Sequence, residues 1–371
     1  MKVALISTTL ESISETFIRR HRDLMDAEVI TYYGGYPSTH NAEDGRFGLT
    51  QWQFYFDTLA RKLGFEVDVK GRALTRSLKK KGIDLCYAEF GPNGVGVMTA
   101  CEALDIPLVV NFHGYDIHKT EVLENYLARY QQLFSIAKAV VAVSREMEKK
   151  LISLGCAPEK IHYLPCAPDD LFFDLELETQ PKSLLAVGRF IDKKAPYLTL
   201  LAFKKVLEKH PDATLTMIGD GPLLTCCKNI ARSQGINNVI FTGAIEHKSV
   251  LGYFKKTAIF VQHSVTDENG NKEGTPVSVM EANAAKIPVV STLHAGIPDV
   301  IINHKSGLLA DEFDVTAMAN SIVSLLDDPE KAKSMGEHGQ TIIKDILGPK
   351  IYKRQLNDII NKAADTATSK I

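Results

Sequence analysis

The chain has 371 residues, of which 45% are hydrophobic and 24% are charged, and its formal net charge at pH 7 is −2. Single hydrophobic cores stop growing near roughly 250–300 residues, so this length predicts two domains, and the composition excludes a disordered or fibrous chain. Charges of both signs are interspersed, which argues against DNA or RNA as a partner.

Short aliphatic runs alternate with helix-like stretches in the first half of the chain. This alternation predicts a parallel sheet covered by helices on both faces, hence an α/β fold. The N-terminal run MKVALI has one lysine and is followed by Ser and Thr, which favours a buried first strand over a signal peptide. The expected strands are residues 2–7, 28–32, 83–88, 108–112, 139–143 and 161–164.

The alternation stops at residues 166–182, which are rich in proline and acidic residues and have neither a helical nor a strand period. We expect a first domain at residues 1–168, a linker at 169–182 and a second domain at 183–349. The second series of expected strands comprises residues 183–187, 214–218, 239–241, 259–262, 288–291 and 307–309.

The sequence after about residue 328 has a continuous helical pattern, interrupted at Leu347, Gly348 and Pro349. Proline lacks a backbone donor and glycine relaxes the backbone, so a separate terminal helix is expected from residue 350 to about 364. No stretch approaches the roughly 20 apolar residues that cross a bilayer. We therefore expect a cytoplasmic protein.

Residues 61–81 contain eight Lys or Arg and two acidic residues, a net charge of +6. Aromatic side chains lie just upstream, at Trp52, Phe54, Tyr55 and Phe56. A basic face preceded by aromatics is suited to anionic lipid headgroups at the inner face of a membrane. A solvated helix face with a few core aromatics is an equally good interpretation.

The most informative segment begins with Glu273, Gly274, Thr275, Pro276 and Val277. The residues from Pro276 to 285 have a helical composition, and Pro276 fits the first turn. The N-terminus of this helix would offer unpaired amides and a positive dipole to a phosphate or diphosphate, and Gly274 would allow close approach. Glu273 could accept hydrogen bonds from sugar hydroxyls.

Glu281 lies eight residues after Glu273 and would contact the same ligand further along the helix. Two glutamates at this spacing are weak evidence by themselves, because charged residues on helices are usually only solvated.

A second group of polar residues follows the first expected strand of the second half, in the sequence Val-Gly-Arg-Phe-Ile-Asp-Lys-Lys ending at Lys194. Ligands of doubly wound sheets bind beyond the carboxyl ends of the strands. Arg189 and Lys194 could together neutralise a leaving diphosphate, next to Gly188. Considered alone, two surface cations in a loop would be the better interpretation.

A third group, Asn-Phe-His-Gly-Tyr-Asp at residues 111–116, places His113 in a loop before a glycine, which suits close approach to a ligand. His113 and His118 lack the spacing of a metal site, and the six cysteines form no Cys-x-x-Cys pair. Glycine turns at residues 219–222 and at Gly243 and Ala244 are weak indications of a nucleotide edge.

Together these motifs resemble the retaining glycosyltransferases of family 4, which have the GT-B fold. EGTPVSVMEA is similar to the family's Glu-x7-Glu signature, GRF-IDKK to its diphosphate-binding Arg and Lys, and FHGYD to its first-domain histidine loop. The resemblance covers most of the chain and is strongest from residue 183 to residue 309. It implies two Rossmann-like domains with a deep cleft between them, and a C-terminal helix, residues 350–371, that crosses back to the first domain.

The resemblance also implies the roles of individual residues. Arg189 and Lys194 would hold the donor diphosphate, Glu273 the transferred sugar and Glu281 the ribose, while His113 would lie beside the sugar. Residues 12–18, Ser-Ile-Ser-Glu-Thr-Phe-Ile, are similar to a segment of exopolysaccharide and colanic-acid-type transferases. Ser14, Glu15 and Thr16 would accordingly lie on the acceptor side.

The expected activity is retaining transfer of a hexose from a UDP- or GDP-linked sugar to a glycan, as in lipid-linked exopolysaccharide or capsule synthesis, with domain closure excluding water. The chain contains no Asp-x-Asp pair, so we expect no metal and no cofactor besides the donor. Two alternatives remain: another sugar-nucleotide enzyme such as an epimerase, and a binding protein without catalysis. A nicotinamide dehydrogenase is disfavoured because Gly-x-Gly-x-x-Gly is absent from the first strand's turn.

Overall fold

The computed structural model describes residues 1–10, 16–47, 55, 59 and 68–368. The chain divides into two compact units. Unit 1 comprises Met1–Val143, Met147–Leu164 and Lys353–Ile371, and unit 2 comprises Ser144–Glu146 and Pro165–Tyr352.

Unit 1 is built on one sheet which, within the described residues, has eight strands in the order β4-β3-β2-β1-β5-β6-β7-β8. The six long strands are parallel, as the alternating sequence predicts. A short antiparallel extension, β3 and β4, continues the sheet beyond β2. The strands are β1 Lys2–Ile6, β2 Glu28–Tyr33, β3 His40–Asn41, β4 Gly45–Arg46, β5 Leu85–Glu89, β6 Leu108–Phe112, β7 Ala139–Ala142 and β8 Ile161–Tyr163.

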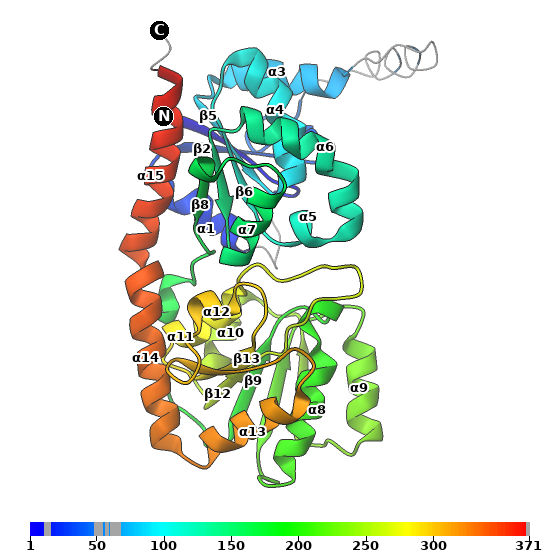
Figure 1. Cartoon of the computed structure of the whole chain (residues 1–371), viewed down its shortest axis with the longest axis vertical. Helices are drawn as coiled ribbons and strands as arrows, with labels where there is room; N and C mark the ends of the chain where they lie inside the picture. The colour runs from blue at the N-terminus through cyan, green and yellow to red at the C-terminus, as the bar shows by residue number, and fades with distance from the viewer. Residues whose placement is uncertain (11–15, 48–54, 56–58, 60–67, 369–371) are drawn as a thin grey trace. The chain divides into compact units, whose positions relative to one another are not determined.

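Helices connect and cover these strands (Figure 1). They are α1 Thr16–Leu24, α3 Val69–Lys81, α4 Gly91–Leu104, α5 Tyr115–His118, α6 Thr120–Ile136 and α7 Arg145–Ser153, with a 3-10 turn η1 at Pro158–Lys160. The β5 and β6 strands are buried along their whole length, which accounts for the lack of an alternation between apolar and polar residues in them.

Unit 2 repeats the architecture with a sheet that, in the described part of the chain, has six strands in the order β11-β10-β9-β12-β13-β14. All its strand pairs are parallel. This is the 3-2-1-4-5-6 order of Rossmann-type sheets, in which the direction of winding reverses between β9 and β12. The strands are β9 Ser183–Val187, β10 Thr214–Ile218, β11 Val239–Gly243, β12 Ile259–Val261, β13 Val289–Thr292 and β14 Gly307–Ala310.

The helices of unit 2 lie around this sheet, among them α8, α9 and α13 (Figure 1). They are α8 Pro196–Leu207, α9 Leu224–Ser233, α10 His247–Phe254, α11 Val277–Ala284, α12 Ile297–Val300, α13 Val315–Leu326 and α14 Pro329–Leu347. Two 3-10 turns, η2 Asp170–Phe172 and η3 Asp192–Lys194, complete the unit.

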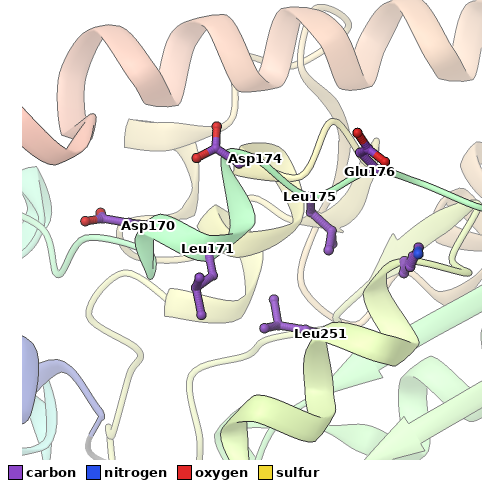
Figure 2. A pocket seen from close by; sticks show the side chains of 7 residues that line it. Asp170, Leu171, Asp174, Leu175, Glu176 and Leu251 are labelled. Carbon is purple, nitrogen blue, oxygen red and sulfur yellow. The ribbon is translucent and has the colours of Figure 1, made fainter.

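Residues 169–182, expected as a linker, belong to unit 2 and carry η2. Phe172 is fully buried there, and its ring centroid lies 4.9 Å from that of Phe254. Beside this segment is a hollow of about 350 Å³, where three leucine side chains point toward one another and the acidic side chains point away from them (Figure 2). Its lining residues are Asp170, Leu171, Asp174, Leu175, Glu176, Leu251 and Lys255.

The final helix, α15 Pro349–Thr368, begins in unit 2 and from Lys353 onward belongs to unit 1. Asn357 anchors it there: its Nδ2 donates to the Leu24 carbonyl, and its Oδ1 accepts from the Asp26 amide at 2.7 Å. The expected return of the C-terminal helix to the first domain is confirmed. Across the described residues, no helix is both apolar and long enough to span a bilayer.

Candidate active site

Lys194 and Gln262 mark the point in unit 2 where the winding of the sheet reverses. Lys194 lies in η3, after β9, and Gln262 directly follows β12, the strand next to β9. The Lys194 Nζ lies 3.5 Å from the Gln262 Oε1, which also accepts from the Ser278 hydroxyl. A ligand site beyond the carboxyl ends of strands is expected at this position of a doubly wound sheet.

Glu273 is the second charged residue of this cluster and is 7% exposed. Its Oε2 lies 3.3 Å from the Lys194 Nζ, and its Oε1 lies 3.7 Å from the Lys193 Nζ. Burial alone would raise the pKa of Glu273, but the two lysines outweigh it and hold the pKa at about 2. Glu273 is therefore a carboxylate at every physiological pH.

The structure thus brings together Lys194 and Glu273, which lie 79 residues apart in the sequence. Burial lowers the pKa of the Lys194 ammonium, and the Glu273 carboxylate opposes that shift. The Lys193 side chain is less exposed than that of Lys194. Its Nζ donates to the Lys272 carbonyl at 3.0 Å, so Lys193 also fixes the backbone next to Glu273. Sequence reasoning named neither Lys193 nor Gln262 as a site residue.

The helix expected after Gly274 and Thr275 is α11, which begins at Val277. Pro276 precedes it as the N-cap with ψ of 120°, so its assignment to the first turn is wrong: its backbone is extended, and only its φ of −63° matches a helix. No side chain caps this helix end, and an uncapped helix N-terminus is suited to an anion. Glu281, on the same helix, is 4% exposed and lies 3.7 Å from the His247 Nε2.

Arg189 follows Gly188 at the end of β9 and is exposed. It is close enough to Lys194 for its positive charge to lower the pKa of that lysine. Gly243 ends β11 with a φ of +74°, and Ala244 beyond it is exposed. The structure therefore places Arg189 and Gly243 at the carboxyl edge of the same sheet.

The turn at Gly219 and Gly221 packs closely against the loop that begins at Gly188. Gly219 has a φ of +139°, and a Cβ on it would lie 2.0 Å from the Gly188 carbonyl oxygen. The Phe190 amide donates to the Asp220 carbonyl at 2.9 Å. This turn after β10 therefore shapes the loop that carries Arg189 and Lys194.

In unit 1, His113 forms part of a buried cluster centred on Glu89. Glu89 ends β5 and is fully buried, with one carboxylate oxygen 2.6 Å from the His113 Nε2 and the other 2.6 Å from the His21 Nδ1. Burial would raise the pKa of Glu89, but the two histidines hold it at about 2. The rings of Phe17 and Phe90 lie 4.5 and 4.6 Å from that of His113.

The backbone of the His113 loop is fixed by Asp116, whose carboxylate accepts from the amides of His113 and Gly114. It also accepts from the Gly91 amide at the start of α4. From the sequence, Asp116 was recognised only as part of the motif at residues 111–116, and neither Glu89 nor His21 was identified as a site residue. A glutamate at the end of an apolar strand was the available signal, since β5 ends at the edge where His113 also lies.

Several sequence-based expectations fall on residues that the structure does not describe. Ser14 and Glu15 lie outside the described residues, and Thr16 is described only as the first backbone position of α1. The basic stretch is described from residue 68 onward. Within the described residues, no cluster of His, Cys, Asp or Glu has the arrangement of a metal site.

Comparison with known families identifies the chain. Residues 168–341 match the family model of glycosyl transferases group 1, and residues 23–170 match the model of glycosyltransferase family 4. The Escherichia coli protein WcaL, named as a colanic acid biosynthesis glycosyltransferase, is 30% identical over 288 residues, which cover 75% of this chain and 70% of WcaL. The chain belongs to glycosyltransferase family 4.

Other comparisons agree with the assignment of the chain to glycosyltransferase family 4. The amylovoran biosynthesis glycosyltransferase AmsK of Erwinia amylovora is 30% identical over 76% of the chain and 70% of AmsK. Anabaena HepE, crystallised with UDP and glucose, superposes with a TM-score of 0.74 at 15% identity over the whole of both chains. Sucrose-phosphate synthase of Thermosynechococcus elongatus gives 0.73 at 17% identity, over 98% of this chain and 99% of its own. The fold is GT-B.

Proposed function

We propose that this glycosyltransferase transfers a hexose from a UDP- or GDP-linked donor to a glycan acceptor, with retention of configuration and without a metal ion. The proposal extends to a lipid-linked exopolysaccharide or capsule intermediate as the acceptor, supported by the names of the relatives WcaL and AmsK. The UDP in the HepE crystals supports a nucleotide-linked donor.

The observation that carries the proposal is the buried contact between Lys194 and Glu273, 3.3 Å apart. Cations aimed at developing negative charge can replace a metal in stabilising a leaving diphosphate. Lys194 supplies a point charge, Arg189 a bidentate fork, and the uncapped start of α11 backbone amides. These three sources of positive potential lie at one edge of the unit 2 sheet.

Glu273 suits a sugar rather than a phosphate, because its carboxylate would repel an anion. Its buried Oε1 receives no hydrogen bond from the described residues, so it retains capacity to accept one from a sugar hydroxyl. The Glu281 carboxylate would accept hydrogen bonds from the ribose hydroxyls. The bond between the sugar carbon and the diphosphate oxygen breaks while the acceptor oxygen bonds to the same face of that carbon. The proton of the acceptor hydroxyl leaves with the diphosphate.

His113 would contact the transferred sugar from unit 1. The 2.6 Å contact between its Nε2 and Glu89 fixes the ring orientation, and the Asp116 bonds fix the backbone. A preorganised imidazole loses little freedom when the sugar binds.

Contact with an anionic membrane through residues 52–81 is also part of the proposal. On α3 the basic residues Lys70, Arg72, Arg76, Lys79 and Lys80 are all exposed, whereas Ala73, Leu74 and Leu78 are buried. One face of α3 is therefore basic and the other packs into unit 1. Such a face suits lipid headgroups.

Substitution of the two cations tests the proposed diphosphate site. Arg189→Ala and Lys194→Ala are each expected to lower kcat at least 100-fold, because losing a transition-state charge partner costs about 2.7 kcal/mol or more. Release of nucleoside diphosphate from a panel of UDP- and GDP-sugars measures the rate. Lys205→Ala, an exposed lysine of α8, is the matched control. Parent rates in both site variants would overturn the diphosphate assignment.

A further inference from the structure

His294 lies behind Glu273 and contacts its backbone. It follows β13, is 1% exposed, and its Nε2 lies 3.1 Å from the Glu273 amide nitrogen. On the other side of the ring, the His294 Nδ1 lies 2.6 Å from the Glu312 Oε1. The histidine therefore connects a carboxylate beyond β14 with the backbone of a proposed sugar-binding residue.

The hydrogen-bonding geometry determines which ring nitrogen carries the proton. The Glu273 amide can only donate, so the His294 Nε2 must be the acceptor and the Nδ1 must bear hydrogen. The Nδ1–H then donates to Glu312. Burial would raise the pKa of Glu312, but its bonds to the His294 ring and the Thr266 amide keep that pKa below its ordinary value. Glu312 is thus an ionised acceptor that selects the tautomer.

Further contacts hold this assembly in place. The Gly296 amide donates to the Gly274 carbonyl at 2.9 Å, so the turn after β13 is bonded to residues on both sides of the Glu273–Gly274 peptide. A Cβ on Gly296 would lie 2.1 Å from the Thr275 hydroxyl oxygen, which shows how closely the turn packs. Next to Glu312, the Phe313 amide donates to the His263 Nε2 at 2.9 Å.

We propose that His294, oriented by Glu312, is a positioning residue that sets the place of the Glu273 carboxylate by holding its backbone amide. The inference rests on the proposed function, in which Glu273 contacts the transferred sugar. Misplacement of a reacting group by about 1 Å can cost about 100-fold in rate, so loss of the Nε2 acceptor should lower kcat. Binding of the nucleotide part should not change, because it depends on other residues.

Two substitutions of His294 separate its two hydrogen bonds. In His294→Gln the amide group occupies the place of Nε2 and can accept from Glu273, whereas in His294→Asn it occupies the place of Nδ1 and reaches only Glu312. We expect kcat of His294→Asn to be about 10- to 100-fold below that of His294→Gln. The dissociation constants for UDP and GDP should stay within about twofold of the parent.

The assays are kcat and KM for the sugar nucleotide that the parent turns over, calorimetric titration with UDP and GDP, and the Tm of each variant. Equal kcat in the two variants would overturn the inference, as would a loss of UDP or GDP binding parallel to the loss of rate. If both variants fail to fold, Glu312→Gln and Glu312→Leu replace them: Gln keeps the acceptor for Nδ1–H and Leu removes it, and equal kcat in that pair is the contrary result.

Glu273→Ala, which removes the acceptor, separates this inference from the proposed function. If Glu273→Ala turns over the donor at the parent rate, Glu273 has no role in transfer and the proposed function itself fails. If Glu273→Ala loses activity while His294→Asn keeps it, only the positioning role of His294 is wrong.

Discussion

Glu89 and Glu273 are buried carboxylates that remain ionised because cations or ring N–H groups surround them. Burial alone would raise the pKa of each, but neighbours from other parts of the chain hold both pKa values at about 2. Such perturbed, paired groups cluster at functional sites. Glu89 lies in unit 1 next to His113, and Glu273 lies in unit 2 next to Lys194.

The Glu89 cluster predicts a pH-dependent contribution to stability. A carboxyl whose pKa falls from 4.5 to about 2 on folding stabilises the protein by about 3 kcal/mol. Because the folded pKa is the lower one, this stabilisation is complete above about pH 4.5 and is lost as the pH falls toward 2. Glu89→Gln should therefore unfold at lower urea concentration than the parent at pH 7, with a smaller difference at pH 4.

The matched control for Glu89→Gln is Glu159→Gln, since Glu159 is exposed. Its urea midpoint should follow that of the parent at both pH values. A Glu89→Gln protein with the parent midpoint at pH 7 would contradict the role of the buried carboxylate.

At the level of single residues, sequence reasoning reached Lys194 and Glu273, whose contact the structure shows, because each belongs to a recognisable local motif. It missed Glu89, His21 and His294. Their significance arises from contacts across strands, and a lone histidine or glutamate in a sequence carries no sign of its distant partner. Only the three-dimensional packing joins His21 to Glu89 across 68 residues.

At the level of elements, the strand-end turns of unit 2 act in pairs. The turn after β10 supports the loop after β9, and the turn after β13 supports the segment that leads into α11. The loops that carry the charged residues are thus held by close contacts with neighbouring loops, and glycines, which have no side chain, lie at these contacts. Glycine at these contacts permits the close approach of two backbones.

Gly219→Ala tests this support. Its φ of +139° strains any side chain, and its Cβ would meet the Gly188 carbonyl oxygen at 2.0 Å. We expect a loss of about 2–5 kcal/mol in unfolding free energy and weaker UDP or GDP binding, because the Gly188 loop must move. Gly235→Ala, with a φ of +66° and open space around the Cβ, should cost about 1–2 kcal/mol and leave binding unchanged. Equal losses in both variants would refute the supporting role.

The long strands of both sheets were predictable because each is a buried aliphatic run. For β6, β9 and β10 the expected and observed limits coincide. The extension β3–β4 was not predicted, since strands of two residues are too short to show a period. The start of α11 was misjudged by one residue because a proline's fixed φ suits both an N-cap and a first turn.

At the level of the whole molecule, the two α/β units and the family are established, whereas the donor base remains a prediction. A thermal-shift screen against UDP, GDP, ADP and their sugars is expected to show stabilisation by one class of nucleotide. At 100 times its dissociation constant, a ligand stabilises by about 2.7 kcal/mol. An absence of any shift across the panel would favour a function that does not use nucleotides.

The path of α15 has a consequence for biosynthesis. Residues from Lys353 onward belong to unit 1 and include the fully buried Leu356 and, one turn later, Ile360. These residues follow unit 2 in the sequence, so they leave the ribosome after it. Most of unit 1 is therefore synthesised before unit 2, and the surface that α15 covers in unit 1 stays exposed until after unit 2 has been synthesised.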